Sequence, residues 1–275
     1  MGDEPPTGSP FAQLDRLPPE VLAGLIAALD ALAAQPEIQR VRRAAQTALL
    51  PLPGQRLLDA GCGAGEVARQ LAALVAPTGE VVAADFSAAA VAIAALRHDG
   101  SRVRYAVGDM TALGFADATF DRVRSERVLQ HLADPDAAVA ELVRVTRPGG
   151  RVCLVDTDWE SLTADGLPDE LTAALRRHLA GGAGPQHRSM GRTLRRRLVR
   201  AGLVDVITEP ITCCFTDPDD AATVLPMFDR RLPMPAGLVP DGMWEGWFAA
   251  VDAAAARGEF LAALTIWTAT ALRPT

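Results

Sequence analysis

Apolar residues in this chain follow two patterns, short runs bounded by turn residues and longer stripes with a spacing of three to four. The short runs predict strands, and the stripes predict amphipathic helices. Between residues 51 and 158 the two alternate, which is typical of parallel βαβ units in a doubly wound sheet. The predicted strands cover residues 56–59, 80–85, 103–107, 120–124 and 151–156, and the helices cover 67–75, 88–97 and 135–145. The fourth run is less apolar than a central strand should be.

The flanking regions are less regular. An apolar stripe runs from Leu14 to Leu32, Pro36 interrupts the pattern, and a second stripe continues to Leu49. The two stripes predict two helices that either cap a ligand pocket or cover a face of the sheet. Beyond Trp159 we expect helices over 168–179 and 191–201, strands over 203–215 and 260–272, and an irregular insertion over 217–258. The resulting division is a disordered lead-in at 1–10, a helical cap at 11–50 and one α/β domain at 51–275.

One stretch near the start of the core carries the clearest chemical signal. The first strand ends at Asp59, and Gly61, Gly63 and Gly65 follow at alternate positions before a helix begins. Glycine accepts positive φ and lets a ligand approach the main chain, and the helix N-terminus adds unpaired N–H groups. A dinucleotide-binding fold would place its third glycine where Glu66 stands. The pattern D-x-G-x-G-x-G instead resembles the first motif of class I S-adenosylmethionine (SAM)-dependent methyltransferases.

Composition then removes several functional classes. The chain of 275 residues is 49% apolar, and no apolar run approaches the roughly 20 residues that span a bilayer. A net charge of −7 argues against a broad nucleic-acid surface. All 27 basic residues are arginine, which excludes a P-loop lysine and a pyridoxal phosphate Schiff base. Asparagine is also absent, which excludes the Asn-Pro-Pro-Tyr motif of methyltransferases that act on amino groups of DNA or glutamine.

Cysteine and histidine usage points to a reducing compartment and to no metal centre. The four cysteines show no C-x-x-C spacing, and the histidines are scattered along the chain. The acidic, Pro/Gly-rich N-terminus, Met1 to Pro10, resembles neither a signal peptide nor a transit peptide. We therefore expect a cytoplasmic protein with reduced thiols and no membrane partner.

Acidic residues lie at the ends of three successive predicted strands. In a doubly wound sheet ligands bind outside the carboxyl ends of the strands. Asp85 lies 24 residues after Gly61 and can accept hydrogen bonds from both ribose hydroxyls, while Asp109, after Gly108, can accept the adenine amino group with Met110 against the ring. Each aspartate alone would more simply be a helix cap or turn residue. Three in succession beside the glycine turn favour a nucleoside ligand.

Five further motifs make the resemblance specific. After D-A-G-C-G-A-G come V-V-A-A-D-F-S, V-G-D-M, F-A-D-A-T-F-D, L-Q-H-L-A-D-P and R-P-G-G-R. In this order, over about residues 50–158, they resemble the UbiE-like branch of class I methyltransferases. The regions Leu167–Ala201 and the last strand are similar, more loosely, to small-molecule methyltransferases of bacterial secondary metabolism.

The resemblance implies a Rossmann-like α/β fold with seven strands in the order 3-2-1-4-5-7-6 and an antiparallel last strand. It also implies that SAM, with S-adenosylhomocysteine as product, is held by Asp59, Gly61, Gly63, Gly65, Asp85, Phe86, Gly108, Asp109, Met110 and Ser125.

The acceptor side is less certain from sequence. His131, just past the fourth strand, is the candidate general base, although it could equally pack against or cap the next helix. The residues expected to border the acceptor are Phe11, Arg127, Gln130, Trp159, His187 and Arg188. Trp159 could stack on a flat or cationic acceptor or pack in the core. The aromatic residues Trp244, Trp247 and Phe248 could form a dimer contact or close over the acceptor.

The leading hypothesis is therefore a methyltransferase that acts on an O, N or C nucleophile of a small organic molecule. A second hypothesis keeps SAM but assigns a non-methylating step such as a cyclisation. A third is an NAD(P)-dependent oxidoreductase, against which Glu66 in place of a third glycine counts. We expect a small-molecule acceptor, a possible homodimer and no nucleic-acid partner.

Overall fold

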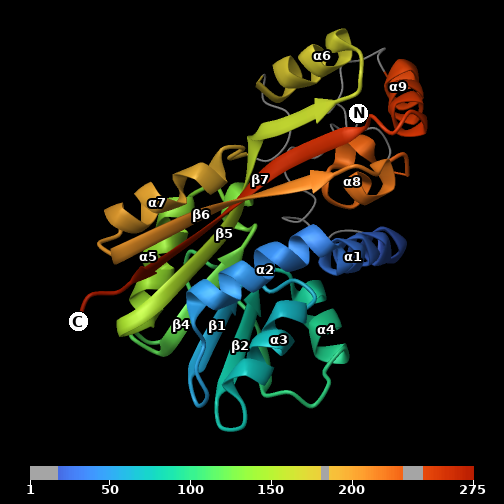
Figure 1. The fold of residues 1–275 in the computed structure, drawn as a ribbon. Coiled ribbons are helices and arrows are strands. Elements are labelled where there is room, and N and C mark those ends of the chain that lie inside the picture. The colour runs from blue at the N-terminus through green and yellow to red at the C-terminus, as the bar shows by residue number, and fades with distance from the viewer. Residues whose placement is uncertain (1–17, 181–185, 232–243) are drawn as a thin grey trace, which may run out of the picture.

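The protein is built on one seven-stranded mixed sheet, seen in a computed structural model that describes residues 18–180, 186–231 and 244–275 (Figure 1). The strand order is β3-β2-β1-β4-β5-β7-β6. The first five strands in sequence are parallel, and β7 is antiparallel to both of its neighbours. The predicted fold class and strand order are thereby confirmed. The strands are β1 (Arg56–Ala60), β2 (Glu80–Asp85), β3 (Val103–Val107), β4 (Phe120–Glu126), β5 (Thr146–Asp165), β6 (Val204–Phe215) and β7 (Leu261–Leu272).

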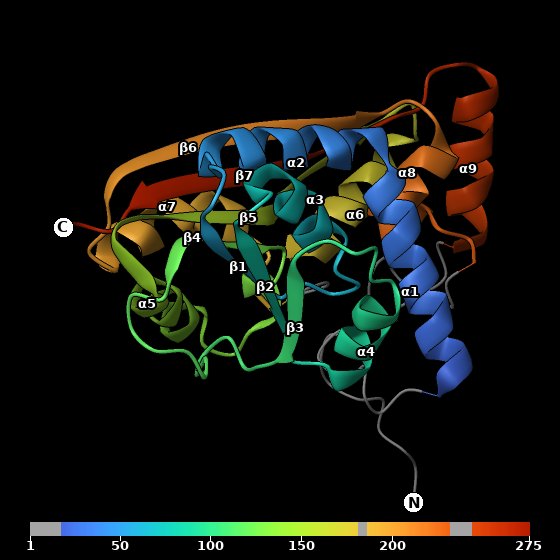
Figure 2. The same cartoon turned by 90° about the horizontal axis from the view of Figure 1, so that it is seen from below.

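Helices cover both faces of this sheet and create two apolar cores (Figures 1 and 2). Since neighbouring side chains on a strand point to opposite faces, Leu57 and Leu58 of β1 enter different cores. The core with Leu57 includes α2 and α3, and the core with Leu58 includes α5 and α7. The helices of these faces are α2 (Pro36–Leu49), α3 (Glu66–Val75), α4 (Ala88–Leu96), α5 (Pro135–Val145) and α7 (Met190–Arg200).

The last three strands of the sheet are longer than the others. The sequence predicted that β5 ends at Asp156, but after an irregularity between Asp158 and Thr163 it pairs with β7 as far as Asp165. Figure 1 shows α6, α8 and α9 gathered around this extension. These elements span α6 (Asp169–Ala180), α8 (Pro218–Val224), the 3₁₀ helix η3 (Pro226–Phe228) and α9 (Trp244–Ala256).

The insertion before β7 belongs to the packed core. Trp247 of α9 is fully buried, and its indole Nε1 donates to the carbonyl of Met227 at 2.9 Å. The ring of Phe228 stacks on this indole with centroids 5.5 Å apart. Phe248 packs partly buried beside the same core. Trp247 thus stabilises the fold and is unavailable for a dimer contact.

Two helices precede the sheet, and Pro36 separates them as expected. Helix α1 (Pro19–Ala34) ends at Gln35, whose side-chain oxygen accepts the N–H of Glu37 at the start of α2. Helix α2 packs against β5 and β7. Across the described ranges no single helix is long and apolar enough to cross a membrane, although the bent pair α1–α2 passes that test by length and composition. The predicted lead-in and Phe11 lie outside the described residues.

Candidate functional site

The glycine turn after β1 is held against two neighbouring loops. The N–H groups of Gly61 and Cys62 both donate to the carbonyl of Ala84 in β2, at 2.7 and 3.0 Å. Gly61 has φ +77°, and a Cβ there would come 2.2 Å from a methyl of Val128 after β4. Gly63 has φ +51°, and a Cβ there would meet nothing within 4 Å. The turn is therefore tight on one side and open on the other, as close approach of a ligand requires.

Asp85, at the end of β2, ties this turn to the next strand. Its Oδ2 accepts the N–H of Gly63 at 2.8 Å, and its Oδ1 accepts the N–H of Ser87 at 3.0 Å. These two hydrogen bonds fix the carboxylate of Asp85 against the glycine turn. The side chain of Phe86 beside it is 63% exposed. This edge combines acceptor groups with an open aromatic surface.

The segment after β3 combines a turn and a core residue. Gly108 donates its N–H to the carbonyl of Asp85 at 2.9 Å, which places the segment beside β2. Oδ1 of Asp109 accepts both the N–H and the hydroxyl of Thr111, at 2.8 and 2.7 Å. Met110 is 6% exposed and belongs to the core with α5 and α7. Asp109 thus caps a local turn and Met110 lies largely in the core, and the expected place of both beside the adenine stays a prediction.

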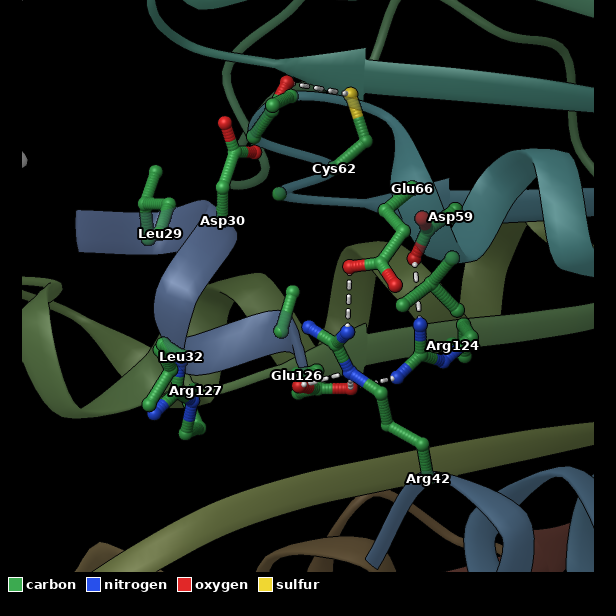
Figure 3. A pocket seen from close by; sticks show the side chains of 15 residues that line it. Leu29, Asp30, Leu32, Arg42, Asp59, Cys62, Glu66, Arg124, Glu126 and Arg127 are labelled. Atoms are coloured by element: carbon green, nitrogen blue, oxygen red, sulfur yellow. Dashed lines mark hydrogen bonds and ion pairs between the residues drawn. The ribbon is translucent and has the colours of Figure 1, made fainter. Parts of the chain in front are cut away.

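A cavity of about 100 Å³ lies between the glycine turn, α1, α2 and the end of β4 (Figure 3). Five charged residues connect across its wall in one series, here termed the charge chain. Glu66 pairs with Arg42 at 2.8 Å, and Arg42 pairs with Glu126 at 3.0 Å. Glu126 pairs with Arg124 at 2.5 Å, and Arg124 pairs with Asp59 at 3.3 Å. The charge chain thereby joins α3, α2, β4 and β1.

Protonation within the charge chain follows from burial and pairing. Burial would raise the pKa of Glu126, but Arg42 and Arg124 outweigh it and lower this pKa to about 2. Burial raises the pKa of Asp59, and Arg124 offsets only part of that shift. Removing one member of such a buried pair leaves an uncompensated charge, which typically costs about 3–5 kcal/mol. The charge chain therefore fixes the shape of the cavity wall.

The loop after β4 contains the predicted base. His131 ends the 3₁₀ helix η2 (Leu129–His131). Burial, together with the nearby charge of Arg127, lowers the pKa of His131 to about 4. The imidazole is then neutral at neutral pH, but it is a weak base. The role of His131 as general base stays a prediction.

Four of the residues expected to border the acceptor form one hydrogen-bonded cluster around Gln130. Its Oε1 accepts the indole N–H of Trp159 at 2.7 Å, and its Nε2 donates to the carbonyl of Arg127 at 3.3 Å. The carbonyl of Gln130 accepts the N–H of His187 at 3.1 Å. Arg188 joins through its carbonyl, which accepts the N–H of Trp159 at 2.7 Å. The structure thus brings together residues from three separate segments of the chain.

Two buried polar groups lie beneath this cluster. Asp156 accepts the N–H of Gln130 at 3.2 Å and that of Thr157 at 2.8 Å. Burial nevertheless raises the pKa of Asp156 to about 7. Ser125, near the end of β4, is buried and its Oγ makes no hydrogen bond. Of the two, Asp156 positions the loop after β4, through its hydrogen bond to Gln130.

The cysteines provide no centre of their own. Cys153 and Cys213 are both buried, and burial raises the pKa of each thiol to about 12. Burial also raises the pKa of Cys62, in the glycine turn. Within the described part of the chain, no three His, Cys, Asp or Glu side chains are grouped to hold a metal ion.

Sequence reasoning missed several lining residues of the cavity. Arg42, Glu66 and Arg124 line it, together with Leu29 and Leu32 of α1. One signal was present, because an arginine in a central strand or within an apolar helix stripe usually has a buried acidic partner. The partner of each one could not be identified from spacing, since α2 and β4 are far apart in the sequence.

Comparisons with known proteins agree with this arrangement. Residues 58–154 match the family described as "Methyltransferase domain". The chain is 36% identical over 242 residues to an uncharacterized 37.1 kDa protein in transposon TN4556 of Streptomyces fradiae, covering 87% of this chain and 68% of that protein. It is 34% identical to an uncharacterized methyltransferase of Schizosaccharomyces pombe, covering 64% and 67%. It is 39% identical to a demethylmenaquinone methyltransferase of Mycobacterium tuberculosis, covering 50% and 56%.

Solved structures show the same fold at lower identity. A putative methyltransferase from Bacillus halodurans has a TM-score of 0.58 at 18% identity, covering 85% of this chain and 99% of that one. The [4+2]-cyclase SpnF has a TM-score of 0.54 at 23% identity, covering 86% and 82%. At these identities the likeness establishes the architecture alone.

Proposed function

This chain belongs to the class I SAM-dependent methyltransferases, and on that premise we propose that its acceptor is a small organic molecule with an O, N or C nucleophile. The observation that carries the proposal is the cluster around Gln130. Trp159, His187 and Arg127 meet there and are partly buried, and Arg127 also lines the cavity beside the glycine turn. A partly enclosed site with few polar groups is typical for small ligands. The demethylmenaquinone methyltransferase relative acts, by its name, on demethylmenaquinone.

The basic run of α7 supports a small acceptor over a nucleic acid. Arg192 pairs with both carboxylate oxygens of Asp158, at 2.5 and 2.7 Å. Arg195 donates to the carbonyl of Val206, and Arg197 pairs with Asp136. These guanidinium groups already have protein partners, which leaves few charges for phosphates.

We also propose a role in secondary metabolism, in keeping with the similarity of Leu167–Ala201 to methyltransferases of that kind.

The residues at the strand ends have proposed roles in holding the cofactor. Asp85, at the end of β2 beside the glycine turn, accepts the ribose hydroxyls, and the exposed Phe86 covers one face of the adenine. Gly63 leaves open space for the ligand beside the main chain. Gly61, Gly65 and Asp59 shape the turn, Gly108, Asp109 and Met110 border the base, and Ser125 borders the amino-acid end.

The sulfonium of SAM supplies an already activated methyl group. The protein then has to align the nucleophile with the S–CH₃ bond and exclude water, and positioning alone can supply about 7–11 kcal/mol of the barrier. Gln130 and Trp159 orient the acceptor, while α1 closes the cavity from outside. His131, as the proposed base, accepts the proton as a neutral imidazole.

The test is turnover with methyl-labelled SAM and a panel of hydroquinones, phenols, amines and β-dicarbonyl compounds. We expect a product heavier by one CH₂ and an equal amount of S-adenosylhomocysteine. Trp159→Ala should lose turnover and keep S-adenosylhomocysteine binding, whereas Asp85→Ala should weaken that binding sharply. A product of unchanged mass would support a rearrangement instead. Label found only in nucleic acid or protein would contradict a small acceptor.

A further inference from the structure

Arg127 has an unusual backbone conformation at the end of β4. Its φ is +54°, a region that L-residues with long side chains rarely occupy. The surrounding structure holds it there, because its N–H donates to the carbonyl of Val155 at 2.7 Å and its carbonyl accepts from Gln130 at 3.3 Å. Strained conformations that persist under such constraint concentrate at ligand sites.

The side chain of Arg127 lines the cavity but differs from the other two arginines there. Arg42 and Arg124 each pair with two carboxylates. The Nε of Arg127 is buried without a hydrogen-bond partner, and no other described residue pairs with its guanidinium. Burial lowers the pKa of Arg127, because Glu126 compensates only part of its charge and Arg42 opposes it. A guanidinium in this state favours an anion beside it.

The charges around the cavity are separated rather than uniform. The charge chain has three carboxylates against two guanidinium groups, and Arg127 supplies the third guanidinium from the opposite side of Glu126 (Figure 3). An excess of negative charge therefore lies toward Asp59 and Glu66, and an unpaired positive charge lies at Arg127. This distribution matches a zwitterion that carries an ammonium and a carboxylate.

We propose that Arg127 binds a carboxylate in this cavity, and that this carboxylate belongs to the amino-acid end of the cofactor. The fork of a guanidinium matches both oxygens of a carboxylate. The cavity also contains Gly61, Gly63 and Asp59, beside which the proposed function places the cofactor, and the inference rests on that placement. The sequence had placed Arg127 at the acceptor, so the acceptor is the other possible source of the carboxylate.

The experiment measures ligand affinity by calorimetry and needs no turnover. The ligands are S-adenosylhomocysteine, its decarboxylated analogue S-adenosyl-3-thiopropylamine, and methylthioadenosine, which lacks the whole amino-acid end. The variants are Arg127→Gln, Arg127→Lys and a control, Arg147→Gln, which removes an exposed arginine at the start of β5 that pairs with Asp121. Thermal unfolding of each variant verifies that it is folded, and Arg127→Lys keeps the test usable should Arg127→Gln not fold.

We expect Arg127→Gln to weaken the binding of S-adenosylhomocysteine by about 10- to 100-fold, which is the effect of losing a charged hydrogen-bonded pair. Binding of the decarboxylated analogue and of methylthioadenosine should not change, and Arg127→Lys should be intermediate. Arg147→Gln should behave as the wild type. Equal losses for S-adenosylhomocysteine and its decarboxylated analogue would overturn the proposal.

A second arm separates the two sources of carboxylate. Benzoate, with benzamide as its uncharged counterpart, is titrated into the S-adenosylhomocysteine complex. Loss of benzoate binding in Arg127→Gln with unchanged S-adenosylhomocysteine affinity would assign the carboxylate to the acceptor and overturn the cofactor assignment. If Arg127→Gln changes the affinity of neither S-adenosylhomocysteine nor benzoate, both assignments of the carboxylate are overturned. Should the wild type bind neither S-adenosylhomocysteine nor methylthioadenosine, the cofactor site itself would be wrong, and this inference with it.

Discussion

Gly61 and Gly63 share a positive φ but have different surroundings. A Cβ on Gly61 would collide with Val128, whereas a Cβ on Gly63 would project into open space on the cavity side. Position 61 requires glycine for packing against the loop after β4. Position 63 leaves the main chain accessible to a ligand. Two residues of one motif therefore serve stability and binding separately.

Alanine substitutions should separate these two roles. Gly61→Ala forces overpacking in addition to an unfavourable φ, so we expect it to lower the free energy of unfolding by about 3 kcal/mol or more. Gly63→Ala should lower the free energy of unfolding by only about 1–2 kcal/mol but weaken the binding of S-adenosylhomocysteine by roughly tenfold or more. Urea unfolding and calorimetry measure both quantities. Equal destabilisation by the two substitutions would contradict this division.

The pH dependence of methyl transfer tests His131. A base must be deprotonated to act, and the pKa of His131 is lowered to about 4. The single-turnover rate should therefore show no inflection that depends on His131 between pH 5 and 8, in contrast to the inflection near pH 6.5 of an unperturbed histidine. His131→Asn should reduce the rate by less than the roughly 10²–10⁴-fold typical of a general base. An inflection near 6.5 that disappears in His131→Asn would show that the low pKa is wrong.

Sequence patterns identified some polar residues of the site but missed others. Asp59 and Asp85 follow predicted strands, so topology alone brings them to one edge. Arg42 lies within the apolar stripe of α2, so no local pattern indicated its role. The sequence showed that β4 is more polar than a central strand should be, but it gave no reason for this. The structure explains it, because Arg124 is buried against Asp59 and Glu126. Such a pairing needs the packing of α2 on the sheet, which no local pattern encodes.

At the scale of elements, the charge chain attaches α2 to the centre of the sheet. Helix α2 packs on β5 and β7 through Ile38, Val41 and Ala45, and Arg42 on the same face reaches Glu126 at the end of β4. Apolar packing alone would allow the helix to slide along the sheet. We expect the buried ion pair between Arg42 and Glu126 to fix this register, and α1 then follows over the cavity.

Glu126→Gln should reveal the strength of this attachment. The substitution leaves Arg42 and Arg124 buried with less compensation, so we expect a loss of about 3–5 kcal/mol in the free energy of unfolding. The control Glu259→Gln removes an exposed ion pair with Arg257 and should cost less than about 1 kcal/mol. Urea unfolding at pH 7 measures both. A loss at Glu126 no larger than at Glu259 would mean that the charge chain does not hold α2.

Element prediction succeeded where one segment carried its own signal. The helix over 135–145 was predicted at its observed bounds, because Asp134 caps it and Pro135 begins it. The extension of β5 to Asp165 was not predicted. Its residues 157–165 are mostly polar, and they form a strand because β7, about a hundred residues later, pairs with them. Strand length set by a distant partner is invisible to a local pattern.

At the scale of the whole molecule, the site lies where the two halves of the sheet meet. The parallel half supplies the glycine turn and Asp85, while the antiparallel half with β5 and β7 supplies Trp159. Asp156 lies at the junction, since it belongs to β5 and accepts the N–H of Gln130 from the loop after β4. Asp156 and His131, on either side of this junction, both have strongly shifted pKa values.

The shifted pKa values of Asp156 and His131 should have opposite effects on how the free energy of unfolding depends on pH. The pKa of Asp156 is raised from 3.8 to about 7, so between these pH values the folded protein keeps a proton that the unfolded chain has lost, and stability falls as pH rises. The pKa of His131 is lowered from 6.5 to about 4, so the unfolded chain binds the extra proton and stability rises with pH over that range. At roughly 1.4 kcal/mol per pKa unit, the two contributions of about 4 and 3 kcal/mol nearly cancel.

The summed contribution of Asp156 and His131 to the free energy of unfolding of the wild type should therefore be nearly flat between pH 4 and 6.5, and single variants should expose the slope of each group. Asp156→Asn should leave a curve that rises by up to about 3 kcal/mol, and His131→Asn a curve that falls by up to about 4 kcal/mol between pH 4 and 7. Urea unfolding across this range measures the slopes, which are independent of any constant cost of substitution. Parallel curves for the three proteins would show that neither group has a shifted pKa in the folded state.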